Sequence, residues 1–425
     1  MIIRIEATRY RCLERLQADL QSYGVIVGAN GAGKTTFLDI PGLLADCLQA
    51  REVAQAFTAK LHNRPARSST LTELVFGGHG DDFILAIEAE LPETIITALL
   101  PSQSGLVQNF EERWLRFIRY EIRFEIFNDR QLIIGNEYLL LFSRTTQPER
   151  GGARLYGEAR RHRDWRFIVD RDSNGEVSFR AETDRRKKAR PAQVDSQMLA
   201  LPKVQFESST DFPASRWLYE FLTTQCVFYR PNIDLLQTAS PPGLSTELLL
   251  DAANLPWLAL ELQKEPEKFA AWVEHVKTAL PQVTAISAIE REEDHHAYLS
   301  VTHNGGYAIT SSGLSEGTLR ILALTILPYL TRRPAMIISE EPENGIHPKA
   351  VEAVLQSLRS IPGTQVLISS QSPVVLAASE LREVLCARLA ANGAATIVPG
   401  PDHPNLKAWK GQIVLGQLFA AGILG

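Results

Sequence analysis

Apolar and polar residues alternate in short runs at the start of the chain, which is the spacing of half-buried β-strands. Three such runs, IIRIEATRY, LQADL and YGVIVG, lie within the first 28 residues. A helix is predicted from Gly33, and Pro41 should kink or end its first part because proline lacks a backbone donor. The alternation returns from about residue 70 to 182, where Asn174-Gly175 is typical of a hairpin turn. This part of the chain therefore predicts an antiparallel β subdomain.

The second part of the chain is dominated by apolar residues at helical spacing. Helices are predicted over residues 212–225, 245–263, 266–280, 311–330 and 348–361. Strands are predicted over residues 297–303, 335–339, 364–370 and 383–390. Beyond residue 330 strands alternate with helices, which predicts a parallel sheet covered on both faces.

These patterns predict an α/β fold class with an antiparallel β subdomain and a helical insert. The expected segments are an N-terminal lobe at 1–182, a mainly helical insert at 183–300, a C-terminal lobe at 301–398 and a tail at 399–425.

Composition narrows the class of protein only a little. A chain of 425 residues is too long for one simple core and predicts two or three domains or lobes. The net charge of −5 argues against coating nucleic acid by bulk charge. The four cysteines are scattered without a CxxC pair, and no apolar run is long enough to cross a membrane. We therefore expect a cytoplasmic protein with no membrane partner.

The strongest chemical signal is a glycine-rich stretch, GANGAGKT at residues 28–35, between a predicted strand and a predicted helix. It fits the phosphate-binding pattern GxxxxGK[ST], in which backbone N–H groups surround phosphate oxygens. Lys34 would reach the β and γ phosphates, and the Thr35 hydroxyl would bind Mg²⁺. The alternative is a glycine-rich turn without a nucleotide, which would not explain why a strand precedes the motif and a helix follows it. The predicted ATP-binding residues are Gly28, Ala29, Asn30, Gly31, Ala32, Gly33, Lys34, Thr35 and Thr36.

A second signal is the group of carboxylates Glu340, Glu341 and Glu343, directly after a buried-looking strand. Neighbouring carboxylates are costly to bury unless a cation offsets them. With a phosphate-binding loop present, Glu340 is predicted to bind Mg²⁺ and Glu341 to act as the general base. Glu343 would brace the turn or pair with an arginine. An acidic surface turn is the alternative for this stretch taken alone.

A third signal is Ser315-Glu316-Gly317, at the start of a predicted helix just before the acidic strand. Taken alone it is a helix N-cap. Beside the other two motifs it resembles the LSGGQ signature of ABC-type ATPases. In that family the signature of one subunit reaches the γ-phosphate held by the other. The resemblance therefore implies a homodimer that sandwiches two ATP molecules.

The chain resembles soluble ABC-type ATPases of the SMC/RecF branch, especially the OLD-like and Septu-type bacterial defence ATPases. The shared stretches are the first strand pair, GANGAGKTT, DAANLPWLALEL, LSEGTLR, EEPENGIHP and ISSQSP. The resemblance implies a P-loop NTPase of the ABC-ATPase head type, a mixed sheet flanked by helices, with ATP and Mg²⁺ as cofactors.

Two departures from these relatives matter. Gln371 stands where most relatives have histidine, and an amide cannot take up a proton near neutral pH, so we expect slow or conditional hydrolysis. OLD-like nucleases also carry a Toprim nuclease domain, for which the residues after Val398 are too few. A separate effector, a nuclease or a toxin, is therefore expected as a partner.

A basic region lies between Arg144 and Arg190, with fourteen lysines and arginines against eight acidic residues. Contact with DNA or RNA is one interpretation, since phosphate contacts supply most non-specific affinity. A solvated hairpin and loop, or a patch for a partner protein, is the other. The candidate contact residues are Arg160, Arg161, Arg163, Arg185, Arg186, Lys187 and Lys188.

The leading hypothesis is an ATP-driven dimerising switch or motor in anti-phage defence or DNA maintenance, with Lys34, Glu341 and Gln371 as catalytic residues. The alternative is a nucleotide-dependent scaffold that inhibits a partner effector and hydrolyses little ATP. An energising subunit of a membrane transporter is disfavoured, because the insert from about residue 50 to 310 is far larger than such subunits carry.

Overall fold

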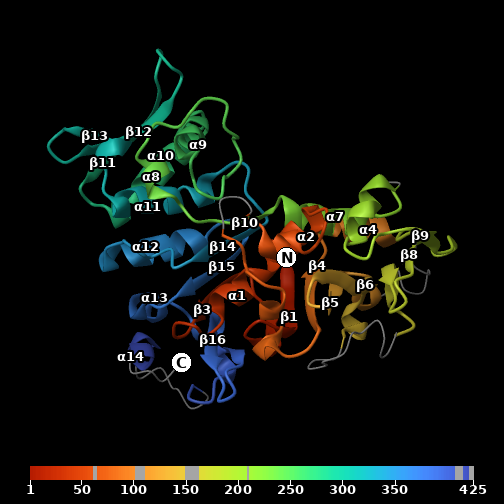
Figure 1. Ribbon diagram of the computed structural model, residues 1–425. Coiled ribbons are helices and arrows are strands. Elements are labelled where there is room, and N and C mark those ends of the chain that lie inside the picture. Colours follow the sequence, from red (N-terminus) through yellow and green to blue (C-terminus); the bar gives the residue numbers. More distant parts are fainter. Residues whose placement is uncertain (61–64, 101–110, 149–161, 208–209, 407–414, 421–425) are drawn as a thin grey trace. The chain divides into compact units, whose positions relative to one another are not determined.

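The computed structural model describes residues 1–60, 65–100, 111–148, 162–207, 210–406 and 415–420 (Figure 1). Their contacts group the chain into two units, each built from segments that are far apart in the sequence. The first unit comprises Met1–Gln21, Asn30–Gln225 and Ala387–Val398. The second comprises Ser22–Ala29, Cys226–Cys386 and Pro399–Gly425. The chain thus passes from the second unit to the first within the glycine-rich stretch, after Ala29.

The first unit contains an eight-stranded sheet in the order β2-β1-β4-β5-β6-β7-β8-β9, in which every neighbouring pair is antiparallel (Figure 1). The antiparallel β subdomain predicted from the alternating pattern is present. Its strands are β1 (Ile2–Tyr10), β2 (Leu13–Asp19), β4 (Asp82–Glu90), β5 (Phe117–Phe127), β6 (Gln131–Phe142), β7 (Arg166–Arg171), β8 (Val177–Phe179) and β9 (Arg190–Ala192). Its helices are α1 (Lys34–Leu38), α2 (Ile40–Gln49), α3 (Gln55–Thr58), α4 (Glu93–Leu99) and α7 (Pro213–Thr223).

The apolar face of this sheet is held by aromatic packing. The rings of Phe83 and Phe124 stack with centroids 4.8 Å apart, and Phe57 meets both rings edge-on. Elsewhere in the sheet the buried Arg119 guanidinium donates to Glu88 at 2.8 Å and to Glu6 at 2.7 Å. Buried charges need such partners because desolvation otherwise disfavours them.

The helix after the glycine-rich stretch is interrupted just before Pro41, as expected from the proline. Helix α1 ends at Leu38 and α2 begins at Ile40, with the proline in its first turn. Arg67 fixes this break, since it donates to Ala56 O at 2.7 Å and forms ion pairs with Asp39 and Asp46.

The second unit is organised around a six-stranded sheet in the order β10-β14-β15-β3-β16-β17 (Figure 1). Its strands are β3 (Tyr23–Val27), β10 (Cys226–Phe228), β14 (Met336–Glu340), β15 (Gln365–Ser370), β16 (Val384–Leu389) and β17 (Ala395–Pro399). From β10 through β14, β15 and β3 to β16, each strand is parallel to the next one in the sheet, as the strand–helix alternation predicted. The end of β16 and most of β17 are grouped with the first unit. Every residue of β3 and β15 is buried, so both faces of these strands are covered.

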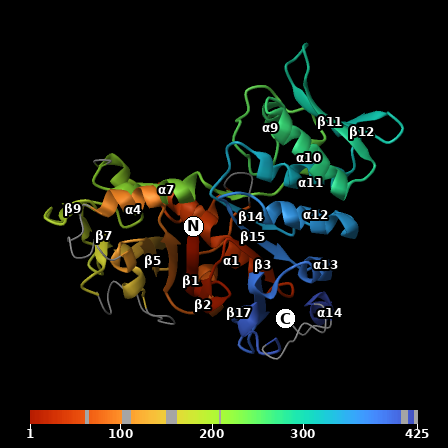
Figure 2. The same ribbon diagram turned by 180° about the vertical axis from the view of Figure 1, so that it is seen from behind.

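Helices and a small sheet complete the second unit. The helices are α8 (Ile233–Leu236), α9 (Leu255–Gln263), α10 (Pro266–Ala279), α11 (Glu316–Thr325), α12 (Pro348–Arg359), α13 (Pro373–Ala377) and α14 (Leu415–Ala420). The small antiparallel sheet, seen beside α9 and α10 in Figure 2, contains β11 (Val283–Glu290), β12 (Ala297–His303) and β13 (Ala308–Thr310).

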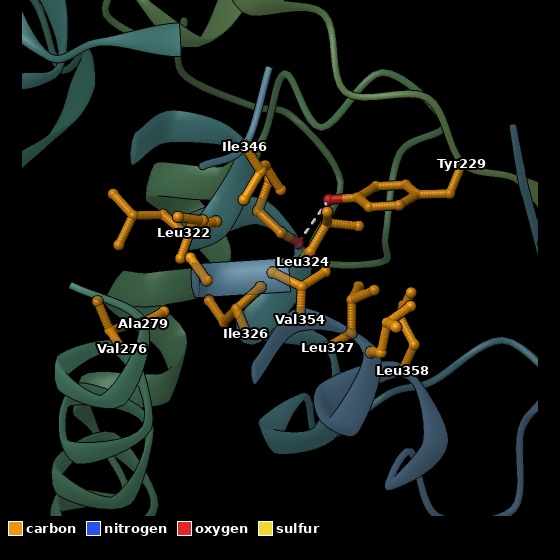
Figure 3. Packing of buried hydrophobic residues seen from close by; sticks show 14 of the residues in the cluster. Tyr229, Val276, Ala279, Leu322, Leu324, Ile326, Leu327, Ile346, Val354 and Leu358 are labelled. Carbon is orange, nitrogen blue, oxygen red and sulfur yellow. Dashed lines mark hydrogen bonds between the residues drawn. The ribbon is translucent and has the colours of Figure 1, made fainter. Parts of the chain in front are cut away.

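The core of the second unit lies where α10, α11 and α12 pack on the parallel sheet (Figure 3). Leu322, Ile326 and Val354 are fully buried in it. One polar group enters this core with its partner, because the Tyr229 hydroxyl donates to the Ala323 carbonyl at 2.8 Å. Such a bond removes the cost of burying the hydroxyl.

The helix predicted over residues 245–263 is wrong in its first half, since α9 begins only at Leu255. The Asn254 amide donates to the carbonyls of Ser245 at 2.6 Å and Glu247 at 2.7 Å, which closes a non-helical loop. Pro256 then occupies the first turn of the helix, a position that suits proline. Within the described part of the chain, no helix is long and apolar enough to cross a membrane.

Candidate functional site

Three parallel strands bring the ends of the predicted motifs to one edge of the second unit's sheet. Val27, the last residue of β3, pairs with Ser370 of β15. Ser369 of β15 pairs with Glu340, the last residue of β14. Gly28, Gln371 and Glu341 follow these strand ends directly in the sequence. The carboxyl edge of a parallel sheet is the usual position for ligand-binding residues in α/β folds.

The glycine-rich stretch adopts a conformation that favours glycine. Gly28, Gly31 and Gly33 have φ values of 154°, 79° and 84°, and the last two lie in the left-handed region that side chains other than glycine rarely adopt. A Cβ on Gly31 would meet no atom within 4 Å. One on Gly33 would lie 2.7 Å from the Ala395 Cβ and 3.2 Å from the Cys12 sulfur. The fold therefore requires glycine at position 33 for packing as well as for backbone conformation.

The predicted phosphate-binding residues differ in exposure. Gly28 is buried, while Ala29, Asn30 and Gly31 are exposed. Ala32 is buried. Lys34 opens α1 with its side chain largely buried, Thr35 is exposed and Thr36 is partly buried. Asn30–Thr36 is grouped with the first unit, whereas Glu340, Glu341 and Gln371 lie in the second.

Glu341 and Gln371 lie in direct contact. The Gln371 amide donates from Nε2 to Oε1 of Glu341, and Asn344 donates from Nδ2 to Oε2 at 2.7 Å. Glu341 also has a left-handed backbone, with φ of 44°. A non-glycine residue held in this region is typical of functional turns.

Glu343 braces the turn, one of the two roles predicted for it. Its Oε1 accepts from the Ser370 hydroxyl at 2.5 Å, and that hydroxyl accepts from the Ser372 backbone N–H at 2.9 Å. The described residues offer its other oxygen, Oε2, no hydrogen-bond donor. Burial raises the pKa of the Glu343 carboxyl above its ordinary value.

The predicted signature lies at the first turn of α11 and touches the acidic turn. Ser315 is the N-cap, and its hydroxyl accepts from the Thr318 N–H at 3.3 Å. The Glu316 carboxylate pairs with Arg320 at 2.9 Å. A Cβ on Gly317 would lie 2.6 Å from the Gly345 carbonyl oxygen. The start of α11 and the turn that carries Glu341 are therefore in close contact.

The candidate basic residues are largely paired with acids where they are described. Lys187 contacts both Asp211 oxygens at 2.7 Å, and Arg186 lies 3.2 Å from Asp184. Arg163 lies 3.6 Å from the Asp164 carboxylate. Both Arg185 and Lys188 are exposed. The remaining two candidates, Arg160 and Arg161, fall outside the described residues.

The residues present fit a magnesium nucleotide by their chemistry. Mg²⁺ takes oxygen ligands and keeps one or two carboxylates together with substrate phosphates, which matches a threonine hydroxyl and a glutamate carboxylate. Among the described residues no group of three or more His, Cys, Asp or Glu side chains could hold a metal ion by itself. Thr35 and Glu340 stay the predicted ligands.

The geometry defines a P-loop ATPase-type protein, and comparison with solved structures gives the same fold. The chain is similar to an SMC head bound to the C-winged helix domain of ScpA, with a TM-score of 0.51, 12% identity, and 93% of this chain and 97% of that chain covered. It is also similar to a Pyrococcus furiosus Smc head bound to the C-terminal domain of ScpA (TM-score 0.49, 12% identity, 93% and 95% covered). A third is the SMC head domain from Thermotoga maritima (TM-score 0.43, 11% identity, 94% and 98% covered).

Residues 25–377 match the family described as "AAA domain, putative AbiEii toxin, Type IV TA system", and the chain belongs to this family. Together with this family match, the SMC-head similarity confirms the fold expected of an SMC/RecF-like ATPase. No curated protein matches the chain. Assignment to the OLD-like or Septu-type group stays a prediction.

Asn344 and Ser370 were not singled out from the sequence. Asn344-Gly345 is a common turn dipeptide, so the sequence signals a turn there. Its contact with Glu341, however, needs the three-dimensional path of that turn.

Proposed function

We propose that the chain binds ATP with Mg²⁺ and hydrolyses it to ADP and phosphate. The observation that carries this proposal is the register of the parallel sheet. Val27 pairs with Ser370 and Ser369 with Glu340, so the glycine-rich stretch, Gln371 and the acid pair leave three adjacent strands at one edge. A P-loop ATPase needs its phosphate-binding loop and its Mg²⁺-binding acid close to one nucleotide, and here both follow strands that end at the same edge, with β15 between β3 and β14.

The proposed roles follow from the chemistry of each side chain. Lys34 supplies a positive charge to the phosphates, and the backbone of residues 28–33 supplies N–H donors. Mg²⁺ held by Thr35 and Glu340 would neutralise phosphate charge. Glu341 orients the attacking water and accepts its proton. The Gln371 amide can donate a hydrogen bond but cannot take up a proton, which supports slow or conditional turnover.

Turnover of ATP by wild-type protein, Lys34→Ala and Glu341→Gln tests the proposal. Lys34→Ala should lose ATP binding and hydrolysis, because the ammonium contacts both ground and transition state. Glu341→Gln should keep ATP binding and lower kcat by about a hundredfold or more, because only the proton acceptor is lost. Wild-type protein that ignores ATP, or Glu341→Gln with wild-type turnover, would contradict the proposal.

We also propose that ATP drives a homodimer in which Ser315, Glu316 and Gly317 of one copy face the nucleotide of the other. Ser315 caps α11, and both Ser315 and Glu316 are exposed, so the first turn of α11 can be reached from the surface. Helix N-termini suit phosphate groups.

We propose a cytoplasmic role in anti-phage defence or DNA maintenance, through control of a separate nuclease or toxin. The family description names a toxin of a type IV TA system, and an SMC head of the same fold binds ScpA. Both support a protein that works with a partner. DNA or RNA contact through the exposed Arg185 and Lys188 belongs to the same proposal.

A second candidate function is a nucleotide-dependent scaffold with little hydrolysis. The contact between Gln371 and Glu341 favours it, since an amide already occupies one oxygen of the proposed base. Turnover measured with and without DNA separates the two functions. DNA-stimulated hydrolysis supports the switch or motor, and flat, near-zero rates with retained ATP binding support the scaffold.

A further inference from the structure

The carboxylate of Glu341 is held by two side-chain amides from different segments. Gln371 comes from the loop after β15 and donates to Oε1, while Asn344 comes from the turn after β14 and donates to Oε2 at 2.7 Å. Each oxygen of this carboxylate thus has its own donor. Two donors on different oxygens fix the plane of a carboxylate, which one donor leaves free to rotate.

The backbone around Glu341 is equally constrained. Its N–H donates to the Ser369 carbonyl at 3.0 Å, and its carbonyl accepts from the Asn344 N–H at 3.0 Å. These bonds hold Glu341 at a φ of 44°. A strained residue of this kind persists only where its surroundings determine its conformation.

A second link ties the same two segments together. Glu343 belongs to the turn and Ser370 to the end of β15, and their side chains meet at 2.5 Å. Glu343 is only 7% exposed, so water competes little for this bond. Two side-chain hydrogen bonds, from Ser370 to Glu343 and from Gln371 to Glu341, therefore link the turn after β14 to the end of β15 and the loop that follows it.

The first turn of α11 supports the turn from its other side. Gly345 follows Asn344 and lies close to α11, because a Cβ built on Gly317 would stand 2.6 Å from the Gly345 carbonyl oxygen. Asn344 is exposed, yet its backbone is confined between α11 and Glu341.

We propose that Asn344 is a positioning residue for hydrolysis, which together with Gln371 fixes the direction in which the Glu341 carboxylate accepts a proton. This inference rests on the proposed role of Glu341 as the general base. A base must lie within hydrogen-bond reach of its water, and small misplacements cost large factors in rate. An amide does not titrate near neutral pH, so this device keeps its geometry at every pH at which the protein works.

The test measures kcat and KM for ATP in Asn344→Ala, with ATP affinity and melting temperature as folding controls. We expect kcat to fall about tenfold while KM and ATP affinity stay within about twofold, because the lost contact orients the base and does not hold nucleotide. Asn344→Asp keeps the size of the side chain but puts a carboxylate beside Glu341, and its kcat should fall at least as far. Asn304→Ala is the matched control, since Asn304 is an exposed turn asparagine of the second unit; its kcat should be unchanged.

Glu341→Gln and the double variant Glu341→Gln/Asn344→Ala separate the two hypotheses. If Asn344 acts through Glu341, the double variant turns over no more slowly than Glu341→Gln alone. If Glu341→Gln abolishes turnover but Asn344→Ala keeps or raises the wild-type kcat, only the positioning role is wrong. If Glu341→Gln keeps wild-type turnover, the proposed function fails and the inference with it.

Discussion

At the scale of single residues, Glu182 is a buried carboxyl with an unusual environment. It is 0% exposed and accepts hydrogen bonds from the backbone N–H groups of Ala214 at 2.6 Å and Ser215 at 2.9 Å. It therefore occupies the N-terminal end of α7, where a carboxylate offsets unpaired donors. Burial outweighs these bonds and raises its pKa from 4.5 to about 7.

This shift predicts a pH dependence of stability. Between pH 4.5 and about 7 the folded protein keeps a proton on Glu182 that the unfolded chain has released. The contribution of Glu182 to stability is therefore full below pH 4.5, is lost as the pH rises towards 7, and stays lost above it. The free energy of unfolding should fall by about 3 kcal/mol over this pH range because of Glu182. Urea unfolding of wild-type protein and Glu182→Gln at pH 5 and pH 8 measures it, and the variant should lack this part of the decline. Equal pH dependence in both proteins would contradict the assignment.

Residue-scale contacts were the least predictable part of the site. GANGAGKT and EEPE identify their chemistry because each pattern is local in sequence. The bond between Gln371 and Glu341 joins residues thirty positions apart. It depends on the pairing of β14 with β15, which no spacing in the sequence reveals.

At the scale of elements, the first turn of α11 leads us to expect an effect on stability opposite to the one that helix propensity predicts. Replacing glycine by alanine inside a helix normally stabilises it by about 1 kcal/mol. In Gly317→Ala the new Cβ would stand 2.6 Å from the Gly345 carbonyl, which is backbone and cannot rotate away. We expect a net loss of about 1–3 kcal/mol instead, measured as a lower melting temperature. A raised melting temperature would show that the two segments are not in contact.

Elements were predictable where their pattern was long. Strands β1, β14 and β15 and helices α10 and α12 follow clear periodicity and lie where the sequence predicted them. Strand β10 was missed because three residues carry no period. The loop closed by Asn254 resembles helix in sequence because its three leucines, 248–250, lead into the helical pattern that begins at Leu255. The hydrogen bonds from the Asn254 side chain to backbone carbonyls oppose a helix there. The division into segments 1–182, 183–300, 301–398 and 399–425 stays a prediction.

At the scale of the whole molecule, the proposed homodimer predicts that the mass of the particle in solution depends on ATP. Glu341→Gln should trap ATP and therefore accumulate the dimer, at twice the 47.2 kDa of one chain. Mass photometry with and without ATP measures this shift. Lys34→Ala, which should lose ATP binding under the proposed function, is the control and should stay monomeric under the same conditions. A mass that does not respond to saturating ATP would contradict the sandwich arrangement.

The path of the chain between its two units has a practical consequence. The backbone changes unit at five places, after Gln21, Ala29, Gln225, Cys386 and Val398. No single cut can free either unit as an independent fragment, and truncation at any of the first four points removes strands from a sheet. Split-protein reporters and fusions should therefore be inserted at exposed loop tips inside a unit, such as the Asn304-Gly305-Gly306 turn, and not at apparent domain boundaries.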